Sequence, residues 1–259
     1  MDRDPKAWLA ALRSSHRRLS GLVEPLGPGQ VGAPSMASDW SIAQVLSHLG
    51  SQAEIFSAIL DAALEERELP GPDAFPPVWD AWNAKSAVDQ VVDSVAANEA
   101  FLRRVETLSD TQLRGLEFKM FGMELDAAGF LRMRVSEHAL HTWDVAASLD
   151  PTASVSPDAV DLLIDTLPEM ARRVGKGLET PLRIRVVTSD PARDLALAVD
   201  EEVEIQPWDD GSTDGVLRLP AEGFVRLVYG RLDDDHAPSV ELEPRGLTLD
   251  RLRSVFPGL

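Results

Sequence analysis

Near residue 150 the apolar residues of this chain change their spacing along the sequence. Before that point they recur at three- and four-residue steps in long segments, which is the period of an amphipathic helix. After it, short runs such as Leu182–Ser189 alternate apolar and polar residues, as half-buried strands do. The sequence therefore predicts an α+β protein with a helical domain at 1–150 and a smaller α/β domain at 151–259.

Four long helices are predicted in the first region. They are Pro5–Leu26, a segment capped by Ser41 that ends before Leu69, Trp79–Leu108 and Leu125–Leu149. Between the second and the third, the stretch at 69–77 contains four prolines, and a helix interior does not tolerate them. Four long helices with short or Pro-rich connections indicate an antiparallel four-helix bundle.

The second region is predicted to mix both element types. A helix is expected at 156–177, because a serine or an aspartate can cap its start and a glycine ends it. Further helices are expected at 221–232 and 248–256. Short strands are expected at 182–189, 194–200, 203–208, 215–220 and 239–244.

Composition excludes several classes of function. The net charge of −18 repels phosphate backbones and anionic lipids, so neither nucleic acid nor a membrane surface is an expected partner. There is no cysteine, so any metal must be held by His, Asp or Glu, and any thiol must come from outside the chain. The charged N-terminus lacks the apolar stretch of a signal peptide and no apolar run reaches 18 residues, so a cytoplasmic protein is expected.

One predicted helix carries a pattern with chemical meaning. Glu137 and His141 are four residues apart and share one helix face, which is the spacing by which one helix supplies two ligands to a metal. Asp144 follows on the same side, where it could orient a ligand or contact a bound molecule. His48, among leucines on the second helix, is the best candidate for a third ligand. Two histidines and one glutamate leave a coordination position open, as catalytic zinc sites do.

Each of these residues also has a plainer interpretation. On spacing alone, Glu137 and His141 form an ordinary helix-surface pair, and His48 is a core histidine. Arg134 could bind a substrate anion, or pair with Glu137 or a neighbouring acid on the surface. Asp144 could be a solvated carboxylate on the helix face. Trp79 could line a cofactor entrance or simply pack. The two histidines in polar surroundings, His16 and His236, are expected at the surface.

Two stretches together resemble a known family. Trp40–Leu49 contains a tryptophan with a histidine eight residues on, and Arg134–Val145 contains Arg-x-x-Glu-x-x-x-His-x-x-Asp. Both resemble the motifs of the mycothiol-dependent maleylpyruvate isomerase family, whose N-terminal domain is a DinB-like helical bundle. Leu227–Leu232 is similar to the Gly-Arg signature of that family's C-terminal domain.

The resemblance implies a metalloenzyme. His48, Glu137 and His141 would bind Zn²⁺ or another divalent metal, and mycothiol would be the thiol cofactor, with Asp144 and Trp79 as its candidate contacts. Arg231, or Arg226 on the same predicted helix, would be the catalytic arginine that reaches the site.

The resemblance leaves the reaction open. The substrate would be a small electrophile, and an arginine suits one that bears a carboxylate. The enzyme would be an isomerase or an S-transferase. A non-catalytic metal- or thiol-binding module and a thiol-independent zinc hydrolase are the alternatives. A monomer or a small homo-oligomer is expected.

Overall fold

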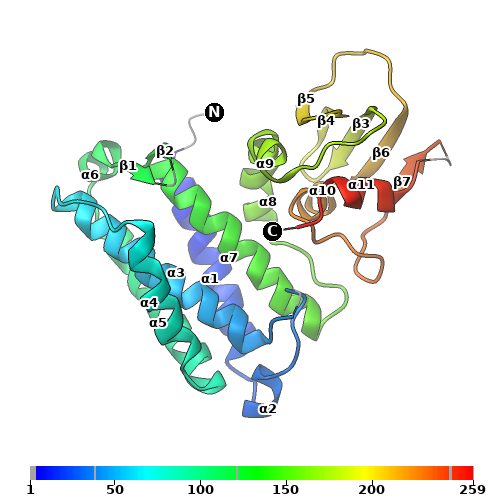
Figure 1. The fold of residues 1–259 in the computed structure, drawn as a ribbon. Coiled ribbons are helices and arrows are strands. Elements are labelled where there is room, and N and C mark those ends of the chain that lie inside the picture. The colour runs from blue at the N-terminus through cyan, green and yellow to red at the C-terminus, as the bar shows by residue number, and fades with distance from the viewer. Residues whose placement is uncertain (1–3, 38, 121, 245–246, 259) are drawn as a thin grey trace. The chain divides into compact units, whose positions relative to one another are not determined.

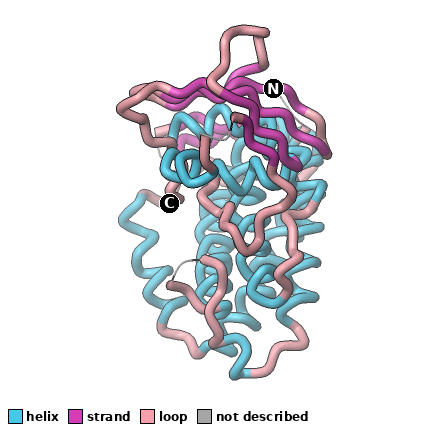
Figure 2. Tube along the Cα trace, turned by 90° about the vertical axis from the view of Figure 1, so that its right-hand side faces the viewer, coloured by secondary structure: helices cyan, strands magenta, loops and turns pink. Residues whose placement is uncertain are grey.

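The computed structural model describes residues 4–37, 39–120, 122–244 and 247–258. The chain divides into two compact units, Met1–Ser154 and Val155–Leu259. The first is mainly helical, whereas the second contains the larger of the two sheets (Figures 1 and 2).

Four long helices form the bundle of the N-terminal unit (Figure 1). Both α1 and α3 pack against α5 and α7, so α1 and α3 occupy opposite corners of the bundle. Helices that are consecutive among these four are therefore not all neighbours in space, unlike those of a simple up-and-down bundle. The bounds of the four are α1 Pro5–Val23, α3 Ile42–Leu64, α5 Ala87–Glu106 and α7 Ala127–Leu149.

Local sequence signals fix where these helices begin. Ser41 caps α3 in a capping box with Gln44, as the sequence predicted. The Asp126 side chain accepts a hydrogen bond from the Gly129 amide at the start of α7. These caps set the first residues of α3 and α7, the two helices that carry the candidate ligands.

The predicted helix Trp79–Leu108 is wrong in one respect. It is two helices, α4 Phe75–Asn83 and α5 Ala87–Glu106, because Ser86 accepts from the Asp89 amide and caps a new helix. The Pro-rich stretch also runs into α4, since its last prolines lie in the first turn, where a missing N–H costs nothing.

The α4 helix rests on α3 close to His48. Gly50 makes this possible, because a Cβ there would lie 2.2 Å from the Trp82 ring. Trp82 is buried, and its indole nitrogen donates to Glu54 on α3 at 2.8 Å.

Several short elements of this unit were not predicted. They are α2 Pro28–Val31, the 3₁₀ turn Pro72–Ala74, α6 Asp110–Gly115 and a hairpin of β1 Glu117–Met120 with β2 Met123–Asp126.

The C-terminal unit holds a five-stranded sheet in the order β5-β4-β3-β6-β7. The pairing of β3 with β6 is parallel and the other three pairings are antiparallel. Alternate residues of β3 are buried, as its apolar–polar alternation predicted. The strands are β3 Leu182–Ser189, β4 Arg193–Val199, β5 Val203–Pro207, β6 Gly215–Pro220 and β7 Glu241–Glu243.

Helices complete this unit. The sheet is contacted by α9 at β5 and by α10 at β3 and β6. The helix predicted at 156–177 is wrong as a single element, because Pro168 starts a new helix after a 3₁₀ turn. The bounds are α8 Pro157–Leu163, the 3₁₀ turn Ile164–Thr166, α9 Leu167–Val174, α10 Ala221–Val228 and α11 Leu249–Val255.

The predicted α+β class, a four-helix bundle followed by a smaller α/β unit, is confirmed. No helix in the described ranges combines the length and the apolar character needed to cross a bilayer.

Candidate metal centre

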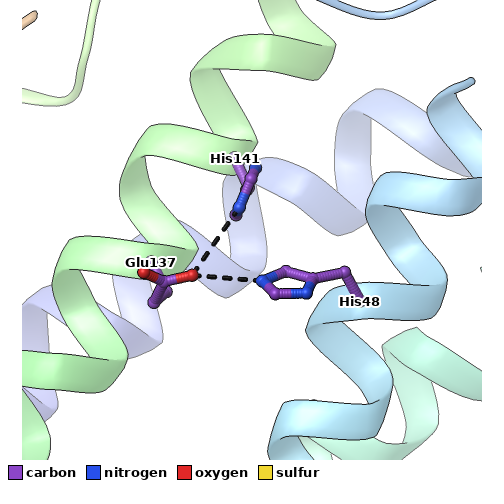
Figure 3. A group of neighbouring side chains, drawn as sticks. All are labelled: His48, Glu137 and His141. Atoms are coloured by element: carbon purple, nitrogen blue, oxygen red, sulfur yellow. Dashed lines mark hydrogen bonds and ion pairs between the residues drawn. The ribbon is translucent and has the colours of Figure 1, made fainter. Parts of the chain in front are cut away.

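Two helices bring three candidate ligands together (Figure 3). His48 lies in the second turn of α3, while Glu137 and His141 lie on α7. Glu137 Oε2 is 3.1 Å from His48 Nε2 and 3.6 Å from His141 Nε2. One potential ligand atom from each residue lies within 4.8 Å of the other two. We call these three residues the His–Glu–His cluster.

The spacing and the donor types fit a divalent ion. Zinc bonds to nitrogen and oxygen are about 2.0–2.1 Å, so ligand atoms around a tetrahedral ion lie about 3.3 Å apart. The side chains of His48 and Glu137 remain 26% and 33% exposed, so a ligand from solvent can reach them. Within the described ranges, no other group of three His, Asp or Glu side chains brings its potential ligand atoms within 4.8 Å of one another.

Asp144 fixes the orientation of one ligand. Its carboxylate is fully buried and accepts from His141 Nδ1 at 2.8 Å. A proton on Nδ1 leaves the lone pair on Nε2, the nitrogen that faces Glu137. A carboxylate behind a ligating histidine is the usual support of such a ligand.

Electrostatics inside the cluster favour the protonation state that a metal needs at two positions. Burial alone would raise the pKa of Glu137, but hydrogen bonds from His141 and His48 hold it well below the usual value. Burial lowers the pKa of His48, despite its hydrogen bond with Glu137.

His141 behaves in the opposite way. Burial would lower its pKa, but hydrogen bonds with Asp144 and Glu137 outweigh this and raise it. A metal at Nε2 therefore competes with a proton at His141 more strongly than it would at a histidine of ordinary pKa.

Two residues beside the cluster were not predicted as site residues. Gln52 Nε2 lies 2.9 Å from both His48 Nε2 and Glu137 Oε2. The sequence offered a signal for Gln52, because it follows His48 by four residues and therefore shares its helix face. The Trp40 ring centroid lies 5.2 Å from that of His48 and 6.0 Å from that of His141. Trp40 is 37% exposed and covers one side of both imidazoles.

Arg134 is not on the surface, which corrects the prediction of a surface ion pair. It is fully buried in the bundle, and its guanidinium donates to the amide oxygens of Gln52 and Asn98. Its length lets it reach across to α3 and α5 from α7.

The other predicted site residues lie in different surroundings. Trp79 is on α4, 43% exposed and beside the Phe75 ring. Arg231 follows α10 in the C-terminal unit, where its side chain donates to the Tyr229 carbonyl. The Arg226 guanidinium is buried against Glu222 and the His236 carbonyl, so Arg231 is the more accessible of the two arginines. Contacts of Trp79 with mycothiol and of Arg231 with substrate stay predictions.

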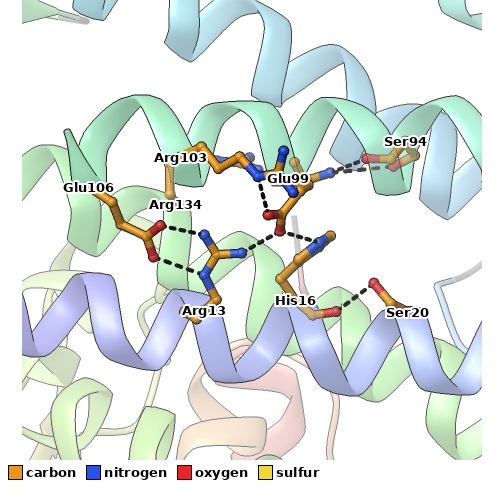
Figure 4. A network of polar contacts seen from close by, with 9 residues as sticks. Arg13, His16, Ser20, Ser94, Glu99, Arg103, Glu106 and Arg134 are labelled. Carbon is orange, nitrogen blue, oxygen red and sulfur yellow. Dashed lines mark hydrogen bonds and ion pairs between the residues drawn. The ribbon is translucent and has the colours of Figure 1, made fainter.

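A second polar cluster joins α1 to α5 (Figure 4). Arg13 donates to Glu99 and Glu106, and Arg103 donates to Glu99 at 2.7 Å. His16 Nε2 lies 3.5 Å from Glu99. We call these residues the arginine cluster.

The two histidines expected at the surface are both partly or wholly enclosed. His16 is buried in the arginine cluster, because its helix turns it inward, so the prediction is wrong for it. His236 is half-buried and contacts Asp233 at 2.9 Å.

The fold and the cluster define a four-helix bundle that carries a candidate divalent-metal site. The profile of the family described as "Mycothiol maleylpyruvate isomerase N-terminal domain" matches residues 12–146, more than half of the chain. This protein belongs to that family. No curated protein matches its sequence at a significant level.

Two solved structures share the fold of this chain. A crystal structure of the mycothiol-dependent maleylpyruvate isomerase matches with a TM-score of 0.68 and 16% identity, covering 93% of this chain and 94% of that one. A histidine-to-alanine mutant of that isomerase matches with the same TM-score and coverage at 14% identity. YfiT from Bacillus subtilis, described as a probable metal-dependent hydrolase with an unusual four-helix bundle topology, matches at 0.43 with 16% identity, over 57% of this chain and 93% of that one.

Proposed function

We propose that this protein is a metal-dependent enzyme that uses mycothiol to isomerise a small electrophilic substrate, in the manner of a maleylpyruvate isomerase. The observation that carries the proposal is the convergence of His48, Glu137 and His141 on one point that solvent can reach. Family membership supports the thiol and the isomerase type of reaction. The absence of cysteine is consistent with it, because the nucleophilic sulfur would come from the cofactor.

The chain's own residues would divide the work. His48, Glu137 and His141 would hold the ion, preferably zinc, and Asp144 would keep His141 Nε2 turned toward it. With both bound, the metal and mycothiol would supply a thiolate, the nucleophilic form of sulfur, which can add to an activated double bond and leave again. Arg231 would bind a substrate carboxylate, for which its planar fork is suited.

The first test is the metal content of the purified full-length protein. We expect about one divalent ion per chain, which is lost in His48→Ala and kept in His236→Ala, a matched histidine outside the cluster. Full metal occupancy in His48→Ala would contradict the ligand assignment.

The second test is turnover of maleylpyruvate with and without mycothiol, followed by proton NMR. We expect isomerisation that needs both the metal and mycothiol. A thioether product that accumulates would identify an S-transferase. Turnover that is unchanged without any thiol would identify a hydrolase or another thiol-independent enzyme. Metal binding with no turnover of a panel of electrophiles would favour a binding module.

A further inference from the structure

Gln52 places its terminal amide group among the candidate ligand atoms. Its nitrogen lies 2.9 Å from His48 Nε2 and 2.9 Å from Glu137 Oε2, while those two atoms are 3.1 Å apart. These separations are close to the spacing of about 3.3 Å between ligand atoms around one tetrahedral ion. The end of the Gln52 side chain therefore occupies a place from which a fourth ligand could reach the metal.

The two ends of an amide behave differently toward a metal. The oxygen has lone pairs and is a common metal ligand, whereas the NH₂ group only donates hydrogen bonds. The two ends have nearly the same shape, so the hydrogen-bond partners decide which one faces the cluster. For Gln52 the orientation therefore decides whether the site is closed by the protein or stays open.

Arg134 settles this orientation. Guanidinium groups only donate, and one Arg134 nitrogen donates to Gln52 Oε1. With the oxygen held by Arg134, the Gln52 nitrogen must face Glu137 and His48. The second Arg134 nitrogen donates to Asn98 Oδ1 on α5 at 2.7 Å, which anchors the guanidinium from the other side.

The burial of the charged Arg134 side chain is energetically unfavourable. It is fully buried over the rings of Phe56 and Phe101, and its Nε has no partner among the described residues. Both groups that accept from it are neutral amides. Burial lowers its pKa to about 10, so it remains charged at neutral pH. An apolar residue of similar volume often gives a protein as much folding stability as a buried charge does. Stability by itself therefore does not explain a buried arginine at this position.

We propose that Arg134 is a positioning residue that keeps one coordination position of the metal centre open, by holding the amide oxygen of Gln52 away from the ligand atoms. The proposal rests on the metal centre of the proposed function, but not on the identity of thiol or substrate. Without Arg134, the Gln52 amide can turn and place its oxygen toward the metal. The metal would then be held by four protein ligands, and an external thiol would have no free position.

The test uses the full-length protein loaded with Co²⁺, with 2-mercaptoethanol as the external ligand. A thiolate bound to cobalt gives a sulfur-to-metal charge-transfer band, so thiol affinity is read directly at saturating cobalt. Gln52→Glu places an oxygen where the N–H group now lies, and Gln52→Leu removes both groups. Arg134→Met releases the Gln52 amide, whereas Arg134→Lys keeps a donor.

We expect the wild type, Gln52→Leu and Arg134→Lys to bind the thiol. Gln52→Glu and Arg134→Met should bind cobalt but take the thiol about tenfold more weakly or worse, the size of effect seen for residues behind metal ligands. Adding Gln52→Leu to Arg134→Met should restore thiol binding, because no oxygen remains to close the site. Gln90→Leu, which removes a buried glutamine on α5, is the matched control and should leave the thiol affinity unchanged.

The outcomes separate this inference from the proposed function. If Gln52→Glu and Arg134→Met bind cobalt and the thiol as tightly as the wild type does, the inference is overturned and the proposed function is not. If the double variant binds the thiol as weakly as Arg134→Met does, the role of Arg134 is only structural, and the inference is again overturned. If Arg134→Met does not fold, the two Gln52 variants still test the inference. Equal thiol affinity in Gln52→Glu and Gln52→Leu would overturn it, because an oxygen at this place would then not close the site. A wild type that binds no cobalt overturns both proposals.

Discussion

Two half-buried glutamates in the same bundle lie next to histidines, yet only one is a candidate metal ligand. The side chains of Glu137 and Glu99 are 33% and 30% exposed, and each has a histidine Nε2 within 3.6 Å. Around Glu99, two guanidinium groups occupy the carboxylate oxygens. Around Glu137, the partners are two imidazoles and a neutral amide.

The difference lies in the charge of the partners. A guanidinium is positively charged at neutral pH, so Arg13 and Arg103 neutralise Glu99 and repel a cation. An imidazole can give up its proton and present a lone pair, so the pair around Glu137 can exchange protons for a metal. A Glu and His at close range are thus a metal site only where fixed cations do not occupy the carboxylate.

Exchanging each glutamate for glutamine should have the largest effect. Glu137→Gln removes the only anionic ligand, so we expect metal affinity to fall on the order of 100-fold or more. Glu99→Gln should leave metal affinity unchanged. Competition with a chromogenic chelator measures both affinities. An equal loss in the two variants would show that Glu99 and Glu137 do not differ as metal ligands.

Asp144→Asn tests how far the cluster depends on the residue behind it. An asparagine cannot replace the carboxylate that holds His141 Nδ1–H, so we expect metal affinity to fall by about 10- to 100-fold. Asp150→Asn, just past the end of the same helix, is the control. Unchanged zinc affinity in Asp144→Asn would remove Asp144 from the metal centre.

Arg13→Met tests the opposite expectation for the arginine cluster. Its side chain bridges Glu99 and Glu106 on α5 from α1, so its loss should lower the free energy of unfolding by roughly 1 kcal/mol. Metal affinity should stay the same. Urea unfolding of the metal-free protein measures the first quantity and chelator competition the second.

The smallest expected effect concerns acid stability. Burial lowers the pKa of His16 below 6.5, with Arg13 and Glu99 acting in opposite directions on it. Since the folded pKa lies below the unfolded one, this histidine contributes stability that is complete above 6.5 and is lost as the pH falls below it.

His16→Gln should therefore flatten the dependence of unfolding free energy on pH between about pH 7 and 5. The dependence should not vanish, because burial also lowers the pKa of His138, whose ring lies 6.0 Å away. Urea unfolding across this range, on metal-free wild type and variant, measures the two slopes. Identical slopes would show that His16 does not titrate in this way.

Much of the site was predictable because it is local. The helical period alone puts Glu137, His141 and Asp144 on one side of α7, whatever the rest of the chain does. The Ser41 cap and the strand alternation of Leu182–Ser189 are equally local and are confirmed. The break at Ser86 was local too, and a serine followed three residues later by an aspartate was the signal that the sequence offered.

Tertiary structure decided what those local patterns become. Whether His48 meets Glu137 depends on how α3 packs and rotates against α7, and neither helix encodes this by itself. The same packing turned His16 and Arg134 inward and set Gln52 between Arg134 and the ligands. The sequence by itself determined which chemical groups share a helix face, because a helix has a fixed period. Only the packed bundle decided which faces meet, because that depends on side chains far apart along the chain.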